Sequence, residues 1–462
     1  MKKKRPPNRP PPPPPERILP TFIQALTLVG IPAPPGFYDR LWTPPITLWY
    51  FIWQGLRLKQ TLEAVLTDAR RGGADALSSG PTPLSQALRS KATTAYAKAR
   101  QRLPLDWVRS AFTQLSGALL HSSGGRPQDL PVELLDGSTK RLRPYGDIAD
   151  HFPAHRTRRQ RSYWCVARVV VSFCAATGLA TAALLGSLHL SEQALAVQLI
   201  LERAARVLYV GDRNFGVWRV VRAAFQSNGQ ALVRLTKVRA RSLLGKKHRT
   251  AFLDLALRWS PTSHDQADAG LLRLPVPGRL VIIQAQRKGY RAQTLYLFTT
   301  LTDGLTYPPQ RLLQLYGWRW QVELDYRTLK STMQMDQSET KSADMVRKEF
   351  YAGLMAYNLV RSLMSSAAEQ SHCPPTALSF TKIHGLLAAI LTELFMASMS
   401  RRHREKRLQW LLAEAAAARL PRRRKPRPHE PRAQYYTPQV FPKMKVPRDE
   451  ARAALKRAPV KS

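Results

Sequence analysis

The stretch from Tyr316 to Lys330 reads Y-G-W-R-W-Q-V-E-L-D-Y-R-T-L-K. At about 100° per residue, a helix over this stretch brings Tyr316, Arg319, Glu323 and Lys330 within about 60° of one another. One carboxylate then shares a stripe with two cations and a phenol. A carboxylate can bind a divalent metal while Arg and Lys neutralise a phosphate held against it. The same pattern also fits an amphipathic helix with an i,i+4 ion pair between Arg319 and Glu323.

The charge of the whole chain favours the phosphate interpretation. The 462 residues include 72 Lys and Arg against 31 Asp and Glu, a formal net charge of +41. Such an excess costs solubility and folding stability unless a polyanion neutralises it. Because 44% of the residues are hydrophobic, the chain can still build a core. Nucleic acid is the expected partner, with an anionic membrane surface as the lesser alternative.

An uncharged run from Val169 to Leu190 is long enough to span a membrane. It opens with three valines and has Gly178 near its centre, so two buried strands joined by a turn explain it better. The N-terminus leads into a proline run, which predicts no signal peptide. The three cysteines follow no metal-ligand spacing and are expected to be reduced. These features predict a cytoplasmic protein with no membrane partner.

The order of the predicted elements indicates an α/β (α+β) fold with a mixed sheet. Strands are expected over 132–135, 163–189 (a pair), 207–210 and 231–237, and helices over 191–205 and 217–226.

Changes in composition divide the chain into expected regions. They are a disordered, basic proline-rich arm (1–18), a helical DNA-binding region (19–125), a catalytic core in two parts (126–237 and 306–367), a β insertion (238–305), a helical region suited to dimerisation (368–420) and a basic tail (421–462).

Two of the predicted strands are followed by an aspartate, Asp136 after Leu135 and Asp212 after Gly211. Taken alone, Asp136-Gly137 often marks only a turn, and Asp212 could equally cap the next helix. If both aspartates meet Glu323 in space, the three carboxylates repel one another. Two divalent cations relieve that repulsion and can clamp a scissile phosphate. A metal site of Asp136, Asp212 and Glu323 is therefore one interpretation of the pattern.

The spacing Y-(2)-R-(3)-E-(6)-K resembles the signature of DDE transposases of the insertion-sequence-four group. Two further motifs resemble those around the family's aspartates, Leu135-Asp-Gly-Ser138 and Asp212-Arg-Asn-Phe215. The resemblance runs over about 130–365 and includes a β insertion before the Glu. One departure is Asn214, where the family usually has Gly or Ala.

This resemblance implies an RNase H-like catalytic core and the activity of a DNA transposase. Mg²⁺, with Mn²⁺ as a possible substitute, would be bound by Asp136, Asp212 and Glu323. Phosphodiester hydrolysis and strand transfer would excise and integrate an insertion sequence by a cut-and-paste route. The partners would be terminal inverted repeats, target DNA and a second subunit in a homodimer, in the cytoplasm of a bacterium and associated with its nucleoid.

Several basic residues are expected to contact DNA. Under the resemblance, Tyr316, Arg319 and Lys330 hold phosphates around the cleavage point. Lys140 and Arg213 lie beside the two aspartates and are further expected contacts. Two alternatives stay open: a catalytically inactive DNA-binding relic of a transposase, and a structure-specific nuclease with the same core.

Overall fold

The computed structural model describes residues 33–37, 40–58, 60–78, 80–122, 130–156, 161–245, 253–263, 265, 268–285, 293–396, 398–421 and 446–457. The predicted proline-rich arm and the first part of the basic tail lie outside these residues. The chain divides into two compact units, one of residues 1–125 and 351–421 and one of residues 126–350 and 422–462. We name them the helical unit and the α/β unit.

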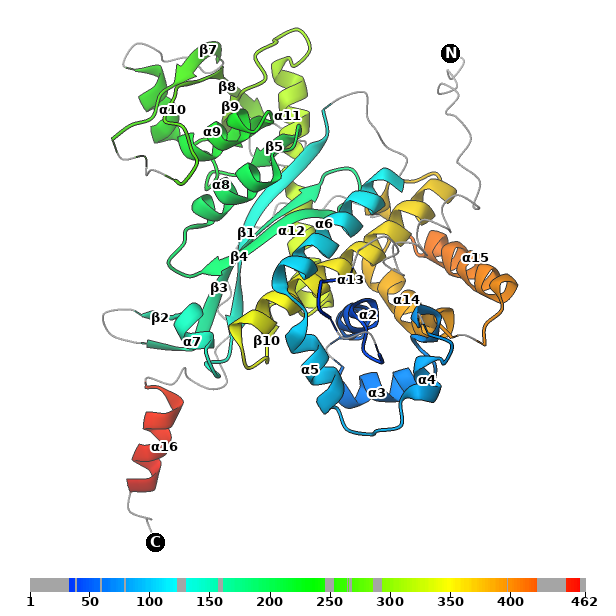
Figure 1. Cartoon of the computed structure of the whole chain (residues 1–462). Helices are drawn as coiled ribbons and strands as arrows, with labels where there is room; N and C mark the ends of the chain where they lie inside the picture. The colour runs from blue at the N-terminus through cyan, green and yellow to red at the C-terminus, as the bar shows by residue number, and fades with distance from the viewer. Residues whose placement is uncertain are drawn as a thin grey trace, which may run out of the picture. The chain divides into compact units, whose positions relative to one another are not determined.

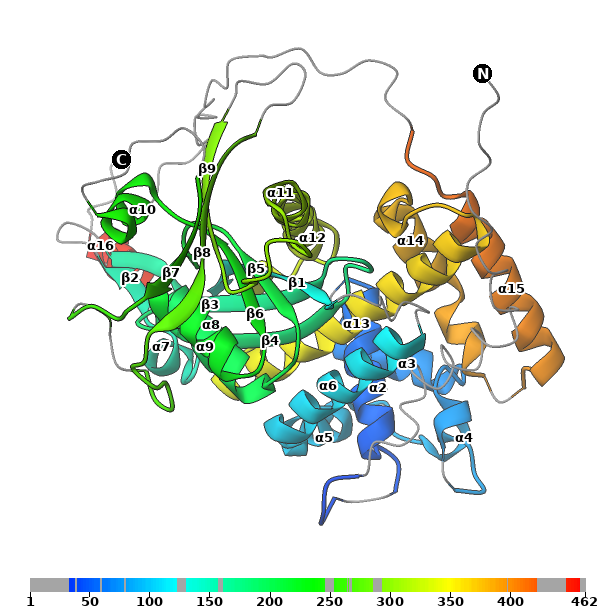
Figure 2. The same ribbon diagram turned by 90° about the horizontal axis from the view of Figure 1, so that it is seen from above.

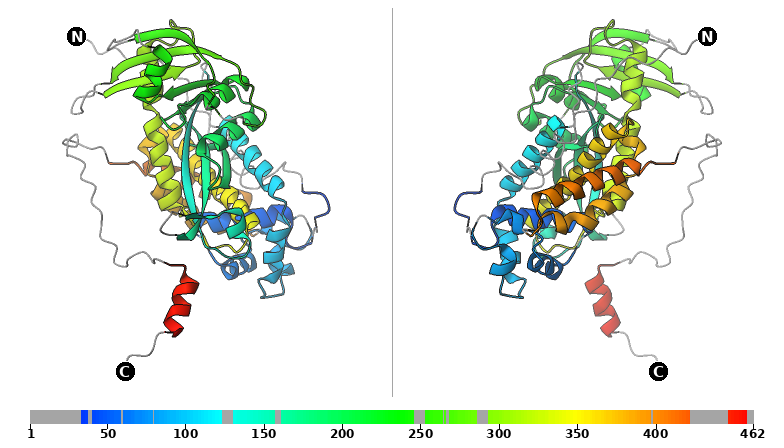
Figure 3. Two further views of the ribbon diagram at one scale, coloured as in Figure 1. Left: turned by 90° about the vertical axis from the view of Figure 1, so that its left-hand side faces the viewer. Right: turned by 90° about the vertical axis from the view of Figure 1, so that its right-hand side faces the viewer.

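The helical unit combines N-terminal helices with helices from much later in the chain (Figures 1 and 3). Trp49 packs on Phe395 with ring centroids 4.1 Å apart, and the Asn358 amide donates to the Ser116 hydroxyl at 3.0 Å. Residues 351–367, expected in the core, therefore group with the N-terminal helices. The helices are α2 (Pro44–Leu56), α3 (Leu62–Arg70), α4 (Leu84–Ala87), α5 (Thr94–Arg102), α6 (Leu105–Ser122), the later part of α13 (Ala343–Gln370), α14 (Phe380–Leu394) and α15 (Arg401–Ala417).

Among the described residues, the α/β unit is built on one mixed sheet of ten strands in the order β2-β3-β1-β5-β6-β9-β8-β7, with β4 paired to β3 and β10 to β1. Strands β1, β3 and β4 are antiparallel neighbours, whereas β5 and β6 run parallel to β1. The order β4-β3-β1-β5-β6 is the RNase H-like arrangement, so the predicted fold class is confirmed. The strands are β1 (Val132–Leu142), β2 (Ala154–Arg156), β3 (Arg161–Cys174), β4 (Ala180–Ser187), β5 (Leu208–Gly211), β6 (Gln230–Arg234), β7 (Leu253–Trp259), β8 (Val276–Ala285), β9 (Gln293–Thr299) and β10 (Gln337–Ser338).

The uncharged run from Val169 to Leu190 forms the last part of β3 and all of β4. The two strands pair antiparallel, and Gly178 between them has φ +74°, which a glycine adopts without steric cost. The strand-pair interpretation of this run is confirmed. Among the residues described, no helix is long and apolar enough to cross a membrane.

Helices cover both faces of the sheet (Figure 2). On one face lie α8 (Glu192–Arg203) and α9 (Trp218–Gln226), which share a buried apolar cluster with Leu135 and Val170 of the strands. On the other lie α11 (Pro309–Gly317) and α12 (Arg319–Arg327). The Ser191 hydroxyl accepts from the Ala194 amide at 3.1 Å and so caps α8, as the sequence predicted.

The β insertion extends the core sheet, because β9 pairs antiparallel with β6. Its first part is helical, where a β insertion was expected from residue 238: Thr236 caps a short helix, α10 (Lys237–Leu244). Arg279 on β8 is 4% exposed and forks onto the Asp254 carboxylate at 3.0 and 2.5 Å.

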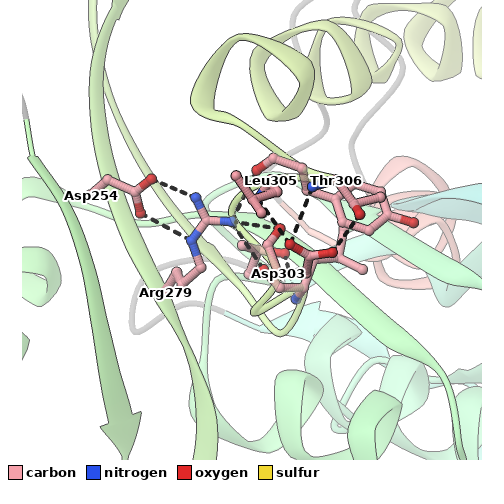
Figure 4. Close-up of polar contacts among 8 residues, drawn as sticks. Asp254, Arg279, Asp303, Leu305 and Thr306 are labelled. Carbon is pink, nitrogen blue, oxygen red and sulfur yellow. Dashed lines mark hydrogen bonds and ion pairs between the residues drawn. The ribbon is translucent and has the colours of Figure 1, made fainter.

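Figure 4 shows how Arg279 also reaches the loop before α11. Its guanidinium donates to the carbonyls of Leu301 and Tyr307 at 3.3 and 2.9 Å. The Asp303 carboxylate, in the same loop, accepts from the amides of Leu305 and Thr306 at 2.9 and 3.2 Å. The Arg279 contacts therefore tie β8 to the loop that leads into α11.

Candidate active site

The candidate active site lies where the pairing of β1 with β5 ends. These strands pair only from Val132 with Leu208 to Leu134 with Val210. Asp136 and Asp212 stand just past the last pair, on the two strands' diverging ends. Carboxyl ends of parallel strands that separate in this way leave room for a ligand at the sheet edge.

Strand β1 is longer than the sequence predicted. A strand ending at Leu135 was expected, but β1 runs on to Leu142, and Asp136 and Gly137 pair with Val171 and Val170 of β3. The prediction of a strand end was wrong because a long partner strand supplies ladder hydrogen bonds that carry β1 through Gly137. Asp136 is thus held in a sheet instead of a loose turn.

The electrostatic surroundings of Asp136 show which groups lie close to it. Burial raises the pKa of Asp136 to about 6, against a hydrogen bond from the Gly137 amide at 2.9 Å that lowers it. Nearby Asp212 and Glu192 raise this pKa further, and Arg319 lowers it. Acids crowded in this way favour a neutralising cation between them.

The signature segment is not one continuous helix. Helix α11 ends at Gly317, α12 begins at Arg319, and a π-helical turn (Thr328–Thr332) follows and carries Lys330. At the start of α12 the backbone amide of Gln321 donates to the Trp318 carbonyl at 2.8 Å, which is a tighter i→i−3 bond. Glycine is a poor helix former, which explains a break at Gly317. The irregularity is local, because Trp318 between the two helices keeps right-handed helical dihedrals (φ −66°, ψ −20°).

The four signature side chains, of Tyr316, Arg319, Glu323 and Lys330, differ in exposure. Tyr316 is 4% exposed, and the Arg319 side chain is 11% exposed. Glu323 and Lys330 are exposed. Burial raises the pKa of the Tyr316 hydroxyl, whereas Arg319 and Arg234 lower it, so both guanidinium groups lie near the phenol.

Helix α12 is anchored beside Asp136. The Tyr326 hydroxyl donates to the Asp136 carbonyl at 2.8 Å, and the Tyr326 ring meets Phe173 of β3 edge-on at 5.4 Å. Glu323 on this helix accepts from Arg319 at 3.0 Å. The i,i+4 pair that the sequence left open is therefore present, on a helix fixed next to one of the aspartates.

We tested whether these acids fit a divalent metal. Carboxylate oxygens are the ligands that hard divalent cations prefer, and Asp136 and Asp212 stand together at the sheet opening. Within the described residues, however, no three His, Cys, Asp or Glu side chains are arranged to hold an ion. Glu323 is engaged by Arg319 instead. The donor chemistry of the two aspartates fits a divalent cation.

The remaining expected DNA contacts are placed differently. Lys140 is 5% exposed, and its ammonium donates to the carbonyls of Met335 and Gln337 at 2.8 and 3.0 Å. It ties β1 to the segment around β10, and this placement does not support the DNA contact predicted for it. Arg213 is exposed beside Asp212, where a phosphate can reach it.

Sequence reasoning missed Glu192 and the role of Asn214. The amide of the Asn214 side chain donates to the Glu192 carboxylate at 2.6 Å, and its backbone amide donates to Asp212 at 2.8 Å. Asn214 is not among the described residues with a positive φ, so no left-handed turn is needed there. The only sequence signal for Glu192 was its position in the first turn of the helix after β4.

With this geometry in place, we compared the chain with known proteins. Residues 128–359 match the family model described as "Transposase DDE domain". The chain is 30% identical over 319 residues to "Transposase InsG for insertion sequence element IS4" of Escherichia coli (strain K12), which covers 67% of this chain and 70% of that protein. A cryo-EM structure of the piggyBac transposase synaptic complex with hairpin DNA aligns with TM-score 0.38 and 11% identity over 86% of this chain and 82% of that one.

The RNase H-like core with paired aspartates at its sheet opening defines a nucleic-acid-processing enzyme of the phosphoryl-transfer class. The matched family model spans half of the chain and the similar transposase spans two thirds of it. The chain belongs to the DDE transposase family and is a DNA transposase. Members of this family bind DNA and use divalent metal ions. The predicted family, activity and fold class are confirmed.

Proposed function

We propose that the chain excises and integrates an insertion sequence by Mg²⁺-dependent cut-and-paste chemistry. The supporting observation is the convergence of Asp136 and Asp212 at the β1–β5 opening, with α12 anchored there by the Tyr326 hydrogen bond of 2.8 Å. Hydrolysis at the element end would free a 3′-hydroxyl, which then attacks target DNA.

Asp136, Asp212 and Glu323 would hold two Mg²⁺ ions, for which Mn²⁺ can substitute. When bound, such a pair activates the attacking water or 3′-hydroxyl and stabilises the leaving oxygen. The protein supplies the fixed carboxylates: Asp136 is locked in the β1–β3 ladder, and Glu323 lies on an anchored helix.

Arg319 would couple DNA binding to this site. An i,i+4 ion pair is worth only about 0.3–0.5 kcal/mol, whereas a guanidinium can fork onto two phosphate oxygens. A DNA phosphate would therefore displace Glu323 from Arg319 and leave its carboxylate facing the aspartates. Lys330 would add a point charge, and the buried Tyr316 hydroxyl a hydrogen bond.

The proposed DNA partners are terminal inverted repeats and target DNA in the bacterial nucleoid. The net charge of +41 supports a large electrostatic share of this binding. A homodimer would bridge two element ends, because joining both ends at one target needs two active sites in one complex.

The test uses linear duplexes that carry the inverted repeats flanking the gene. We expect wild type to cut at the repeat tips with Mg²⁺ and to join the ends to target DNA. Glu323→Gln should lower cleavage at least 10³-fold and leave DNA affinity within about twofold, because a metal ligand is lost and no phosphate contact is. The matched control is Glu405→Gln in the helical unit, whose i,i+4 pair with Arg401 has the same 3.0 Å distance.

Three outcomes would overturn the proposal. Cutting without joining would indicate a structure-specific nuclease. Tight binding without cutting in either Mg²⁺ or Mn²⁺ would indicate a DNA-binding relic. Equal cleavage by wild type and Glu323→Gln would remove Glu323 from the chemistry.

A further inference from the structure

A cavity of about 820 Å³ lies in the α/β unit, outside the candidate active site. Its walls are the first turns of α8 and α9, helix α10 and the end of β7, which Figure 1 shows in green. They include the N-cap residues of all three helices, Ser191, Val217 and Thr236. A helix carries partial positive charge at its N-terminus. The backbone therefore adds to whatever attraction the lining side chains have for an anion.

Charged side chains give the cavity a clear excess of positive charge. Arg219, Arg239 and Arg258 line it, against one acid, Asp265. The Asp265 carboxylate is already engaged, because it accepts from the backbone amide and the hydroxyl of Thr262 at 2.6 and 2.8 Å. A hollow lined by one sign of charge concentrates ions of the other sign. The lining therefore favours a negatively charged ligand.

The arginines of the cavity differ in how far other groups engage them. The Arg219 side chain is 7% exposed, and it is held by the Asp268 carboxylate at 3.2 Å and the Ser191 hydroxyl at 2.6 Å. Arg258 is exposed at the end of β7 and forms no ion pair within the part of the chain that the structure describes. A guanidinium can fork onto two oxygens of a phosphate. Arg219 thus shapes the wall, and Arg258 is available to a ligand.

The cavity adjoins the segment that follows Asp212. From the cavity side, the Gln193 side-chain amide donates to the Asn214 carbonyl at 2.8 Å, and the Arg239 guanidinium donates to the Gly216 carbonyl at 2.6 Å. Both bonds join the cavity wall to the turn after this aspartate. A ligand whose negative charges repeat along a chain is therefore suited to occupy the sheet opening and the cavity together. A DNA strand has that property, whereas a single free anion does not.

We propose that the cavity binds a phosphate group of a DNA backbone, with Arg258 and Arg239 as its side-chain contacts. Arg239 has further donors besides the one bound to Gly216. Because phosphates carry no sequence information, this contact holds duplexes of any sequence and is separate from the signature segment. The inference uses no metal and no cleavage step, so it can fail while the proposed metal chemistry holds, and the reverse.

Fluorescence anisotropy of the full chain, without Mg²⁺ and with labelled duplexes that lack element ends, tests this site. Arg258→Ala should weaken binding about three- to tenfold for every duplex sequence, because one phosphate contact is lost. The slope of log affinity against log salt concentration should become less steep by about 0.9, the share of one phosphate. The control is Arg206→Ala, which removes an exposed arginine of the same unit outside the cavity and should change both quantities much less.

A second variant closes the cavity without altering charge. Ser242 is exposed on α10 and lines the cavity, so Ser242→Trp should weaken binding to a similar extent. Its control is Gln198→Trp, at an exposed position of α8 outside the cavity, which should leave binding unchanged. Unchanged affinity and salt slope in both Arg258→Ala and Ser242→Trp would overturn the proposal, and so would an equal loss in Arg206→Ala.

Calorimetry with inorganic phosphate at constant ionic strength separates DNA from a free anion. If the cavity is built for a DNA backbone, inorganic phosphate should bind weakly, and Arg258→Ala should reduce DNA affinity. Phosphate binding that Arg258→Ala abolishes, with DNA affinity and salt slope unchanged, would mean that the cavity takes a free anion and would overturn the proposal.

Discussion

Glu133 and Asp136 lie three residues apart on β1, near opposite ends of α8, and the fold surrounds them in opposite ways. Glu133 is 3% exposed and accepts hydrogen bonds from Ser172 at 2.6 Å and Thr181 at 3.0 Å, as well as an ion pair from Arg203. Asp136 accepts from its neighbouring Gly137 amide and stands among other acids, which raise its pKa.

The difference separates a carboxylate that the fold satisfies from one that we propose to act in catalysis. A buried charge with its full set of donors is tolerated, whereas removing one partner from such a pair is strongly destabilising. A carboxylate kept close to other acids costs stability, and such perturbed groups cluster at functional sites. One strand therefore carries both cases, on opposite faces of the sheet.

Removing the partner of Glu133 should break the structural side of this comparison and give the largest effect on stability. Arg203→Met leaves the Glu133 carboxylate buried without its cation, so we expect a loss of about 3–5 kcal/mol in the free energy of unfolding. Urea denaturation measures it. Arg401→Met, at an exposed pair, should change stability by under about 1 kcal/mol. A loss below 1 kcal/mol for Arg203→Met would mean that the pair is not structural.

Neutralising Asp136 should change the free energy of unfolding in the opposite direction. The pKa of Asp136 is raised to about 6 in the folded chain, above its value in the unfolded chain, so its ionised form costs stability at neutral pH. Asp136→Asn should therefore stabilise the metal-free protein by about 1–3 kcal/mol at pH 7.5.

The size of this gain should depend on pH. As pH falls through about 6, the wild-type carboxyl takes up a proton and the cost of its charge disappears. Denaturation in EDTA at pH 7.5 and pH 5.0 tests this, with a smaller gain expected at pH 5.0. A destabilising Asp136→Asn at both values would place Asp136 in the same class as Glu133.

Arg319 extends the comparison between the two kinds of carboxylate. It pairs with the exposed Glu323, whereas Arg203 pairs with the buried Glu133. Arg319→Ala should weaken affinity for element ends about tenfold, the size of one lost charge-assisted phosphate contact of about 1.4 kcal/mol. Fluorescence anisotropy without Mg²⁺ measures it, and Arg401→Ala is the control. Unchanged end affinity and cleavage would remove the proposed phosphate role.

Gly137→Ala should have the smallest effect on stability. The added methyl meets only the end of the flexible Glu192 side chain, at 2.4 to 2.8 Å, so we expect less than about 1 kcal/mol. Gly117→Ala has no atom within 4 Å of the new methyl and serves as the control. A large loss of stability would show that the Glu192 side chain cannot move away from Gly137.

Local patterns predicted much of the sheet and its covering helices. The β3–β4 pair, the Ser191-capped α8 and the helix after Asp212 follow from hydrophobic runs, turn glycines and capping residues, all of which act over a few neighbours. The length of β1 and the break at Gly317 were missed. A strand's extent depends on the partner beside it, and helix continuity on packing that no short window contains.

The residues of the candidate site were predictable to about the same extent as the strands and helices of the fold. Motif spacing singled out Asp136, Asp212 and Glu323, because a family signature is written in the chain. The buried place of Lys140 was not predictable, since it depends on a carbonyl of Met335 far along the chain. Glu192 was missed for the same reason: a helix N-terminus looks alike in sequence whether it faces solvent or an acid pair.

The sequence by itself determined the excess of positive charge, the alternation of strands and helices, and the spacing of the acids within their motifs. These are properties of composition and of near neighbours, which folding does not change. Only the tertiary structure decided that β1 and β5 separate beside two aspartates, that Arg319 holds Glu323, and that Asn214 draws Glu192 toward Asp212. Such contacts join residues distant in sequence, so they exist only once the sheet has paired and the helices have packed on its two faces.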